Sequence, residues 1–168
     1  RLTLLNALGT QVSGLTGAPA AGPLVAADYR IHPYHLVKGS VATPPGGCVA
    51  RILTEQQFLA GEDPRGALVM LEPFTPPRGA VLAPILDQGG LGFITDRVSG
   101  RYAHPDCLTW VNAGTEGTAW HVMADDRPFI AFSVSPRMGD QIRFSANRRP
   151  LTARVECDGR RAPGILPA

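Results

Sequence analysis

The stretch Ala67-Leu-Val-Met-Leu71 decides the fold of this chain. It is a continuous apolar run between Gly66 and Pro73, which is typical of a β-strand buried on both faces. The apolar residues that follow at helical spacing are Val81, Leu82, Ile85 and Leu86. Leu91-Gly-Phe-Ile-Thr95 then has the composition of a second buried strand. Two buried strands joined by a helix within about thirty residues predict a crossover unit with parallel strands.

The ends of the intervening helix are marked by residues with special backbone preferences. Thr75, followed by Pro76, is predicted to cap its start, because proline lacks the N–H that would be unpaired there. Gly89 and Gly90 are predicted to end it. Pro84 removes one hydrogen bond and is expected to bend or shorten the helix.

Further elements follow from the same patterns. Strands are predicted at residues 48–53, 129–134 and 151–155, and a short polar turn or helix at residues 54–61. Ser135 before Pro136 predicts the N-cap of a last helix, with Asn147 as its stop. The predicted fold class is therefore mixed α/β: a central mixed β-sheet that forms a sandwich or an open barrel, with two to three short flanking helices.

The first 46 residues differ from the rest, because Gly, Pro, Ala and Ser interrupt them repeatedly. We expect residues 1–46 to form an extended segment that packs on a core made by residues 47–168, within one structural domain. The stretch from Leu2 to Leu8 fits either a helical turn or a strand, since so short a run has no decisive period.

Composition excludes several functions. A chain of 168 residues is about one domain, and its net charge of +2 is too small for a nucleic-acid footprint. No apolar run approaches the roughly 18 residues of a membrane span. Cys48, Cys107 and Cys157 have no C-x-x-C spacing, which argues against a zinc knuckle or a disulfide framework and leaves their redox state open.

Four segments, in order, resemble the protease-associated domain. They are residues 44–53, 65–71, 81–94 and 128–142. Ala67 stands where the family usually has Lys, and Gly89-Gly-Leu-Gly92 resembles its glycine-rich turn between helix and strand. In the family such domains are non-catalytic insertions or lids in subtilisin-like proteases, zinc aminopeptidases and sorting receptors. Thr43-Pro-Pro-Gly-Gly47 and the Trp- and Asn-containing stretch near residue 110 most resemble the aminopeptidase versions.

The resemblance implies a non-catalytic accessory domain of a larger, zinc-dependent aminopeptidase, acting as a lid, in substrate access or in interaction. It implies no cofactor in this chain and zinc in the parent catalytic domain. The expected partners are that catalytic domain, in the same polypeptide, and a peptide substrate, without nucleic acid or membrane. The family is more often secreted or extracytoplasmic.

Two alternatives stay open. A swivelling phosphohistidine-type domain shares the Gly-rich β/α character, but it needs a His in a Thr-Ser-His-like turn after Gly-Gly. Gly89-Gly90 is followed by Leu91-Gly-Phe-Ile-Thr95 without His. The other alternative is an independent peptide- or sugar-binding module.

Two histidine motifs have the residue types of metal ligands but lack the surroundings that a metal site needs. His104-Pro-Asp106 lacks a preceding buried strand and a neighbouring acid, so a turn with Pro105 is predicted instead. In His32-Pro-Tyr-His35 the proline disfavours a helix that would put both imidazoles on one face, so a surface turn is predicted. No catalytic or metal-binding residue is assigned.

Residues 97–127 form a long irregular stretch, which is often functional in a compact domain. It carries the candidate surface for a partner or substrate, made of Trp110, Asn112, Trp120 and His121. Trp is enriched at interface hot spots. The alternative is a hairpin whose two indole rings pack on the domain's own sheet.

Overall fold

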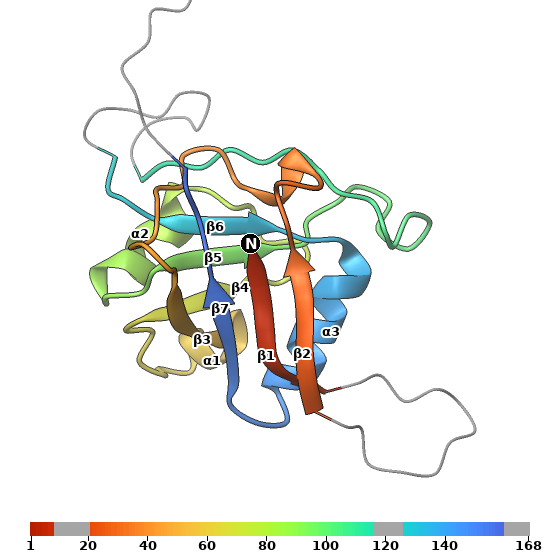
Figure 1. The fold of residues 1–168 in the computed structure, drawn as a ribbon, viewed down its shortest axis with the longest axis horizontal. Helices are drawn as coiled ribbons and strands as arrows, with labels where there is room; N and C mark the ends of the chain where they lie inside the picture. The colour runs from red at the N-terminus through yellow and green to blue at the C-terminus, as the bar shows by residue number, and fades with distance from the viewer. Residues whose placement is uncertain (9–20, 116–125, 160–168) are drawn as a thin grey trace, which may run out of the picture.

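Seven strands form one mixed β-sheet in the computed structural model of the chain, which describes residues 1–8, 21–115 and 126–159. The strands are β1 (Leu2–Leu8), β2 (Ala21–Ala27), β3 (Cys48–Thr54), β4 (Ala67–Met70), β5 (Gly92–Thr95), β6 (Ile130–Ser133) and β7 (Leu151–Val155). Their order across the sheet is β2-β1-β7-β3-β4-β5-β6. The helices are η1 (Pro33–His35), α1 (Glu55–Leu59), α2 (Gly79–Asp87) and α3 (Pro136–Ala146). The sheet curls into a half-barrel flanked by short helices, which confirms the predicted fold class (Figure 1).

The parallel half of the sheet consists of β3, β4, β5 and β6. Every residue of β4, β5 and β6 is buried, and Val69 of β4 pairs with Phe93 of β5. Helices cover such a sheet on both faces, which is why these strands are apolar along their whole length. The predicted crossover unit, β4-α2-β5, is confirmed.

The antiparallel half is built by the two ends of the chain. β7 pairs with β3 on one side and with β1 on the other, and β2 pairs with β1. Leu2 lies opposite Val155 and Leu4 opposite Ala153, and both leucines are fully buried. The stretch that sequence periodicity could not classify is thus a strand, and one of its two partners, β7, lies about 150 positions further along the chain.

The sheet separates two apolar clusters. One lies on the face covered by α3, where Ile142 packs with residues such as Leu4, Leu68 and Ile94. The other lies on the opposite face, where Leu82 and Ile85 of α2 pack with residues such as Val69, Phe93 and Phe129. Both faces of the parallel strands therefore contribute to the core.

Helix α3 begins and ends where the sequence predicts. The Ser135 hydroxyl accepts a hydrogen bond from the Met138 N–H at 3.3 Å, and Asn147 is the C-cap. The segment predicted as a short turn or helix after β3 is helix α1, which begins with a capping box formed by Thr54 and Gln57. Within residues 1–8, 21–115 and 126–159, no helix has the length and apolar character needed to cross a membrane.

The predicted start of the α2 helix is wrong. Helix α2 begins at Gly79 with Arg78 as its N-cap, which makes no side-chain cap hydrogen bond. The Thr75 hydroxyl donates instead to Glu55 Oε1 at 3.0 Å, so it ties the loop after β4 to α1. Pro84 is accommodated inside this nine-residue helix, and Gly89, at φ 83°, follows its end as predicted.

Candidate functional site

Trp110 and Asn112 lie on an extended segment beside the parallel half of the sheet. The Lys38 N–H donates to the Val111 carbonyl at 2.9 Å, and the Ala113 N–H donates to the Lys38 carbonyl at 3.2 Å. Trp110 is 45% exposed, Val111 is buried and Asn112 is half-buried, as expected for side chains that alternate along an extended chain. Residues that are paired or two apart share a side, so Lys38, Trp110 and Asn112 project together. We call this surface the Trp110 face.

The segment behind the Trp110 face is fixed to strand β6. The Val37 N–H donates to the Ala131 carbonyl at 3.1 Å, so residues around Val37 follow β6 as a further extended segment. The Ser133 hydroxyl donates to the Thr109 carbonyl at 3.1 Å. The half-exposed indole of Trp110 therefore projects from backbone that is hydrogen-bonded on both sides.

Only half of the predicted surface can be located. Trp120 and His121 lie outside the described residues, whereas Trp110 and Asn112 lie on the face just defined. The hairpin alternative depends on residues 116–125, which also lie outside the described residues. Asn112 itself pairs with Lys38 in a parallel bridge.

The histidines of the other motifs take different roles. His104-Pro105-Asp106 forms the predicted turn, and Asp106 accepts two hydrogen bonds from Arg137, at 2.7 and 2.9 Å. The hydrogen bonds from Arg137 hold the pKa of the Asp106 carboxyl below its ordinary range. In residues 1–8, 21–115 and 126–159, no group of three or more His, Cys, Asp and Glu side chains is arranged to hold a metal ion.

His32 precedes the 3-10 helix η1, and His35 is its last residue. The predicted surface turn is thus a short helix, with His32 as its N-cap, because Pro33 fits the first helical position. The His35 imidazole lies 2.8 Å, Nδ1 to oxygen, from the Ser133 carbonyl, which can only accept a hydrogen bond, so Nδ1 carries the proton. Burial lowers the pKa of His35, although the bond to Ser133 opposes the shift.

A buried charge cluster lies at the carboxyl ends of β4 and β5, and the sequence reasoning missed it. Asp96 is fully buried, and its carboxylate accepts from Arg101 Nη1 at 3.1 Å and from both terminal nitrogens of Arg143. Asp140 Oδ1 accepts from Arg101 at 2.6 Å and from Arg143 at 2.8 Å. Arg143 also donates to the Leu71 carbonyl, just past β4, at 3.0 Å. We call these four charged residues the Asp96 cluster.

The Asp96 cluster is neutral and hydrogen-bonded throughout. Asp140 is partly exposed, and although burial opposes the shift, hydrogen bonds from Arg143 and Arg101 hold the pKa of its carboxyl below the ordinary range. Because both Asp96 oxygens accept from guanidinium groups, the cluster clamps the loop after β5 against α3 rather than presenting a free carboxylate.

One sequence signal could have found Asp96. It directly follows the buried strand β5, and in open α/β sheets functional side chains often stand at the carboxyl ends of strands. Its two arginine partners carry no such signal, because Arg101 is in a loop and Arg143 is in a helix, 47 residues from Asp96.

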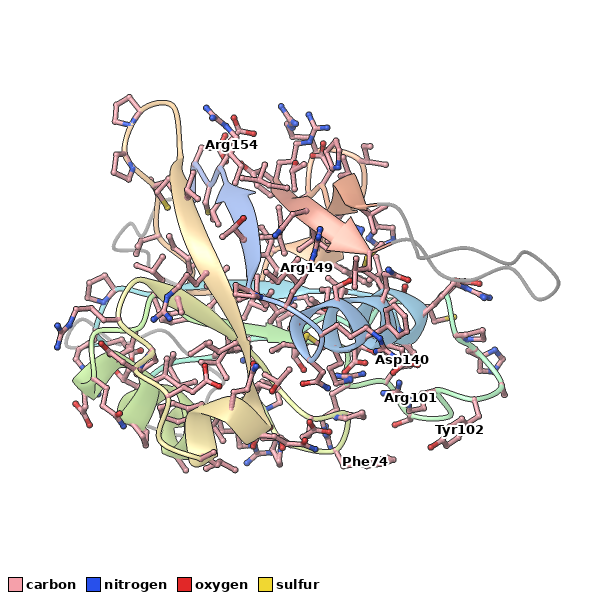
Figure 2. All side chains as sticks on the ribbon, turned by 90° about the horizontal axis from the view of Figure 1, so that it is seen from below. Phe74, Arg101, Tyr102, Asp140, Arg149 and Arg154 are labelled. Atoms are coloured by element: carbon pink, nitrogen blue, oxygen red, sulfur yellow. The ribbon has the colours of Figure 1, made fainter. Side chains whose placement is uncertain are left out.

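Two exposed aromatic rings flank this end of the sheet. Phe74, in the loop after β4, is 72% exposed, and Tyr102, in the loop after β5, is 87% exposed. Figure 2 shows both rings on the side of the molecule that carries Arg101 and Asp140. The Arg101 guanidinium lies 5.9 Å from the centre of the Tyr102 ring, a distance compatible with a cation–π contact.

The fold is shared with parts of two solved peptidase structures. An aminopeptidase from Aneurinibacillus sp. strain AM-1 superposes with a TM-score of 0.52 at 16% identity, over 74% of this chain and 27% of that chain. A peptidase M28 precursor from Shewanella amazonensis SB2B superposes with a TM-score of 0.50 at 16% identity, over 92% of this chain and 33% of that chain. The sequence matches no family model and no curated protein.

These similarities concern the fold and the fraction of each peptidase chain that has it. At 16% identity they show a shared fold alone. The chain spans 27% and 33% of the lengths of the two peptidase chains. In both proteins this fold is thus one part of a considerably longer polypeptide.

Proposed function

We propose that this chain is a protease-associated, non-catalytic domain of a larger aminopeptidase. The observation that carries the proposal is the fold match to about a quarter and a third of two peptidase chains, one of them named as an aminopeptidase. The four segments that resemble protease-associated domains support the same assignment, since they contain all of β4 and β6 and most of β3, α2, β5 and α3.

The proposed role is to cover or shape the cleft of a catalytic domain in the same polypeptide. The Trp110 face, together with Trp120 and His121, is the proposed contact surface. The half-exposed indole of Trp110 supports this contact surface, because Trp supplies a large contact area. The backbone that carries Trp110 is already held by hydrogen bonds, so binding a partner would cost little backbone freedom.

Zinc belongs, in this proposal, to the catalytic domain. The described residues of this chain do not fit a catalytic zinc site, which takes three protein ligands, because no group of three candidate ligands is gathered among them. The chain's own contribution is to bind, orient and restrict access to a peptide.

The coding sequence around this segment and the activity of the chain test the proposal together. We expect zinc-ligand motifs of a peptidase in the coding sequence next to this segment. We also expect the 168-residue chain, with zinc added, to leave aminoacyl 4-nitroanilides intact, while the full-length polypeptide hydrolyses them. Hydrolysis by the isolated chain, or a full-length protein without peptidase activity, would contradict the assignment.

A further inference from the structure

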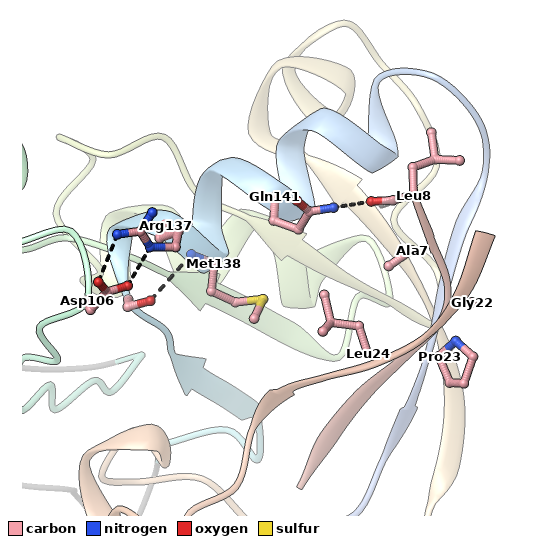
Figure 3. Close-up of a pocket in the computed structure, with 10 residues that line it drawn as sticks. Ala7, Leu8, Gly22, Pro23, Leu24, Asp106, Arg137, Met138 and Gln141 are labelled. Carbon is pink, nitrogen blue, oxygen red and sulfur yellow. Dashed lines mark hydrogen bonds and ion pairs between the residues drawn. The ribbon is translucent and has the colours of Figure 1, made fainter. Parts of the chain in front are cut away.

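A cavity of about 500 Å³ lies between α3 and the outer strands β1 and β2, on the side of the sheet away from α2 (Figure 3). Leu8 and Leu24 line it from the strands, and Met138 and Gln141 line it from the helix. Its size is within the range of known binding pockets. It is separate from the Trp110 face, which contributes no residue to its lining.

The middle of the cavity is apolar and adaptable. Leu24 and Met138 pack on the α3-side core but remain partly accessible. Methionine is unbranched and polarizable, so it adjusts to ligands of different shape. Pro23 and Ala7 add further apolar surface.

The ends of the cavity are polar but carry no net charge. At one end Arg137 and Asp106 form a two-bond ion pair. At the other end the Gln141 side-chain amide donates to the Leu8 carbonyl. Figure 3 shows the two pairs on opposite sides of Met138. Such a lining favours an uncharged apolar group over an ion, because neither end offers an unpaired charge.

The cavity adjoins the edge of the sheet. In the part of the chain that the structure describes, β2 is the outermost strand, and β1 is the strand that pairs with it. An edge strand presents backbone N–H and C=O groups that an added strand can use. Gly22, Pro23 and Leu24 of β2 all line the cavity. Pro23 has no N–H, so an added strand can pair only with the carbonyl groups and the other amides of β2.

We propose that this cavity binds an extended peptide segment that lies along β2 and inserts an aliphatic side chain between Leu24 and Met138. Backbone pairing with an edge strand provides affinity, and a pocket for alternate side chains provides selectivity. Among the described residues, β2 supplies the sheet edge and the cavity supplies the side-chain pocket that this mode requires. The uncharged ends of the cavity favour an aliphatic side chain. The inference concerns the chain alone and does not depend on the proposed function.

Gly22 offers a way to block the cavity without removing a native contact. Apart from Gly22 and its two chain neighbours, no heavy atom lies within 4 Å of the place where a Cβ on Gly22 would stand, and the φ of Gly22 is outside the left-handed region. The added side chain in Gly22→Val should therefore occupy the cavity, and the high β-propensity of Val should preserve strand β2. Val25→Gln is the matched control, because Val25 is on the same strand, is 40% exposed and does not line the cavity.

The test is a titration of the ¹⁵N-labelled 168-residue chain with the peptide acetyl-Thr-Val-Leu-Val-Thr-amide, followed by NMR. We expect saturable shifts at the amides of Gly22, Leu24, Met138 and Gln141, with a Kd below about 1 mM. The polar peptide acetyl-Thr-Ser-Lys-Ser-Thr-amide should cause no such shifts. Gly22→Val should weaken binding by about tenfold or more, and Val25→Gln should leave it unchanged.

Several results would overturn the inference. These are equal binding of both peptides, shifts confined to the Trp110 face, or an unchanged Kd in Gly22→Val. Shifts of the same amides on concentrating the chain without peptide would assign the edge to self-association instead. If Gly22→Val does not fold, Met138→Gln gives the same comparison, because it makes the cavity polar at a partly exposed position.

Discussion

Gly139 of α3 leaves the space that the Asp96 side chain occupies. A Cβ at position 139 would lie 2.6 Å from the Asp96 Cβ and closer still to its carboxylate. This contact brings α3 against the carboxyl end of β5, where Arg101 and Arg143 reach the same carboxylate. The absence of a side chain at 139 is thus a condition for the Asp96 cluster.

Gly139→Ala should destabilise the protein by about 1–3 kcal/mol through overpacking. The sign is informative, because Gly→Ala inside an unhindered helix stabilises by up to about 1 kcal/mol. Urea denaturation of the two proteins measures the difference. A variant as stable as the parent, or more stable, would show that helix and carboxylate are not in contact.

Asp96→Asn should cost about 3–5 kcal/mol, because it leaves two buried guanidinium groups without their full counter-charge. Asp140→Asn is the matched control: Asp140 contacts the same two arginines, but its side chain is 64% exposed, so a loss below about 1 kcal/mol is expected. Chemical denaturation at neutral pH separates the two. Equal losses would mean that Asp96 is not the buried centre of the cluster.

Ile94→Ala should cost about 2–5 kcal/mol, because Ile94 is fully buried in β5 and its truncation leaves a cavity. Val49→Ala on β3 should change stability by less than about 0.5 kcal/mol, since Val49 is 62% exposed. Unfolding free energies for both variants check the placement of the parallel core. A small loss at position 94 would contradict it.

Asp28 makes an acid-sensitive contact in the turn that joins β2 to η1. Its carboxylate accepts from the Arg30 backbone N–H at 3.1 Å and from the Arg30 side chain at 3.0 and 2.9 Å. The hydrogen bonds from Arg30 lower the pKa of Asp28 from its ordinary value of 3.8 to about 2.

Because the folded pKa of Asp28 is depressed, its stabilising contribution is present above the ordinary value of 3.8 and is lost as the pH falls towards 2. Thermal midpoints of the parent should therefore fall more steeply over this interval than those of Asp28→Asn. Parallel curves for the two proteins would show that the Arg30 contact does not persist in solution.

The sequence predicted the parallel core because its signals are local. The apolar run that becomes β4 is bounded by Gly66 and Pro73. Ser135, the N-cap of α3, stands directly before the first residue of that helix. The antiparallel edge was not predictable in this way. Leu2–Leu8 becomes a strand between β2 and β7, and β7 comes from the other end of the chain, so no local period carries that information.

The candidate site shows the same division. A long irregular stretch with tryptophans was visible in the sequence, and Trp110 is exposed on it. The Asp96 cluster was not visible, because it joins a strand end, a loop and a helix that meet only in the fold. Thr75 illustrates the opposite error: a good capping residue that bonds Glu55 instead, because that carboxylate lies within reach after folding.

The kcat/KM of the full-length polypeptide on an aminoacyl 4-nitroanilide, compared with that of its Trp110→Ala variant, tests the central claim most directly. Leu59→Ala is the control, because Leu59 is 74% exposed on α1 and lies outside the Trp110 face. We expect Trp110→Ala to fold normally and to change kcat/KM by about tenfold, equivalent to about 1.4 kcal/mol, while Leu59→Ala leaves it unchanged. An unchanged kcat/KM in Trp110→Ala, or a full-length protein without peptidase activity, would contradict an accessory domain that meets its catalytic partner through this face.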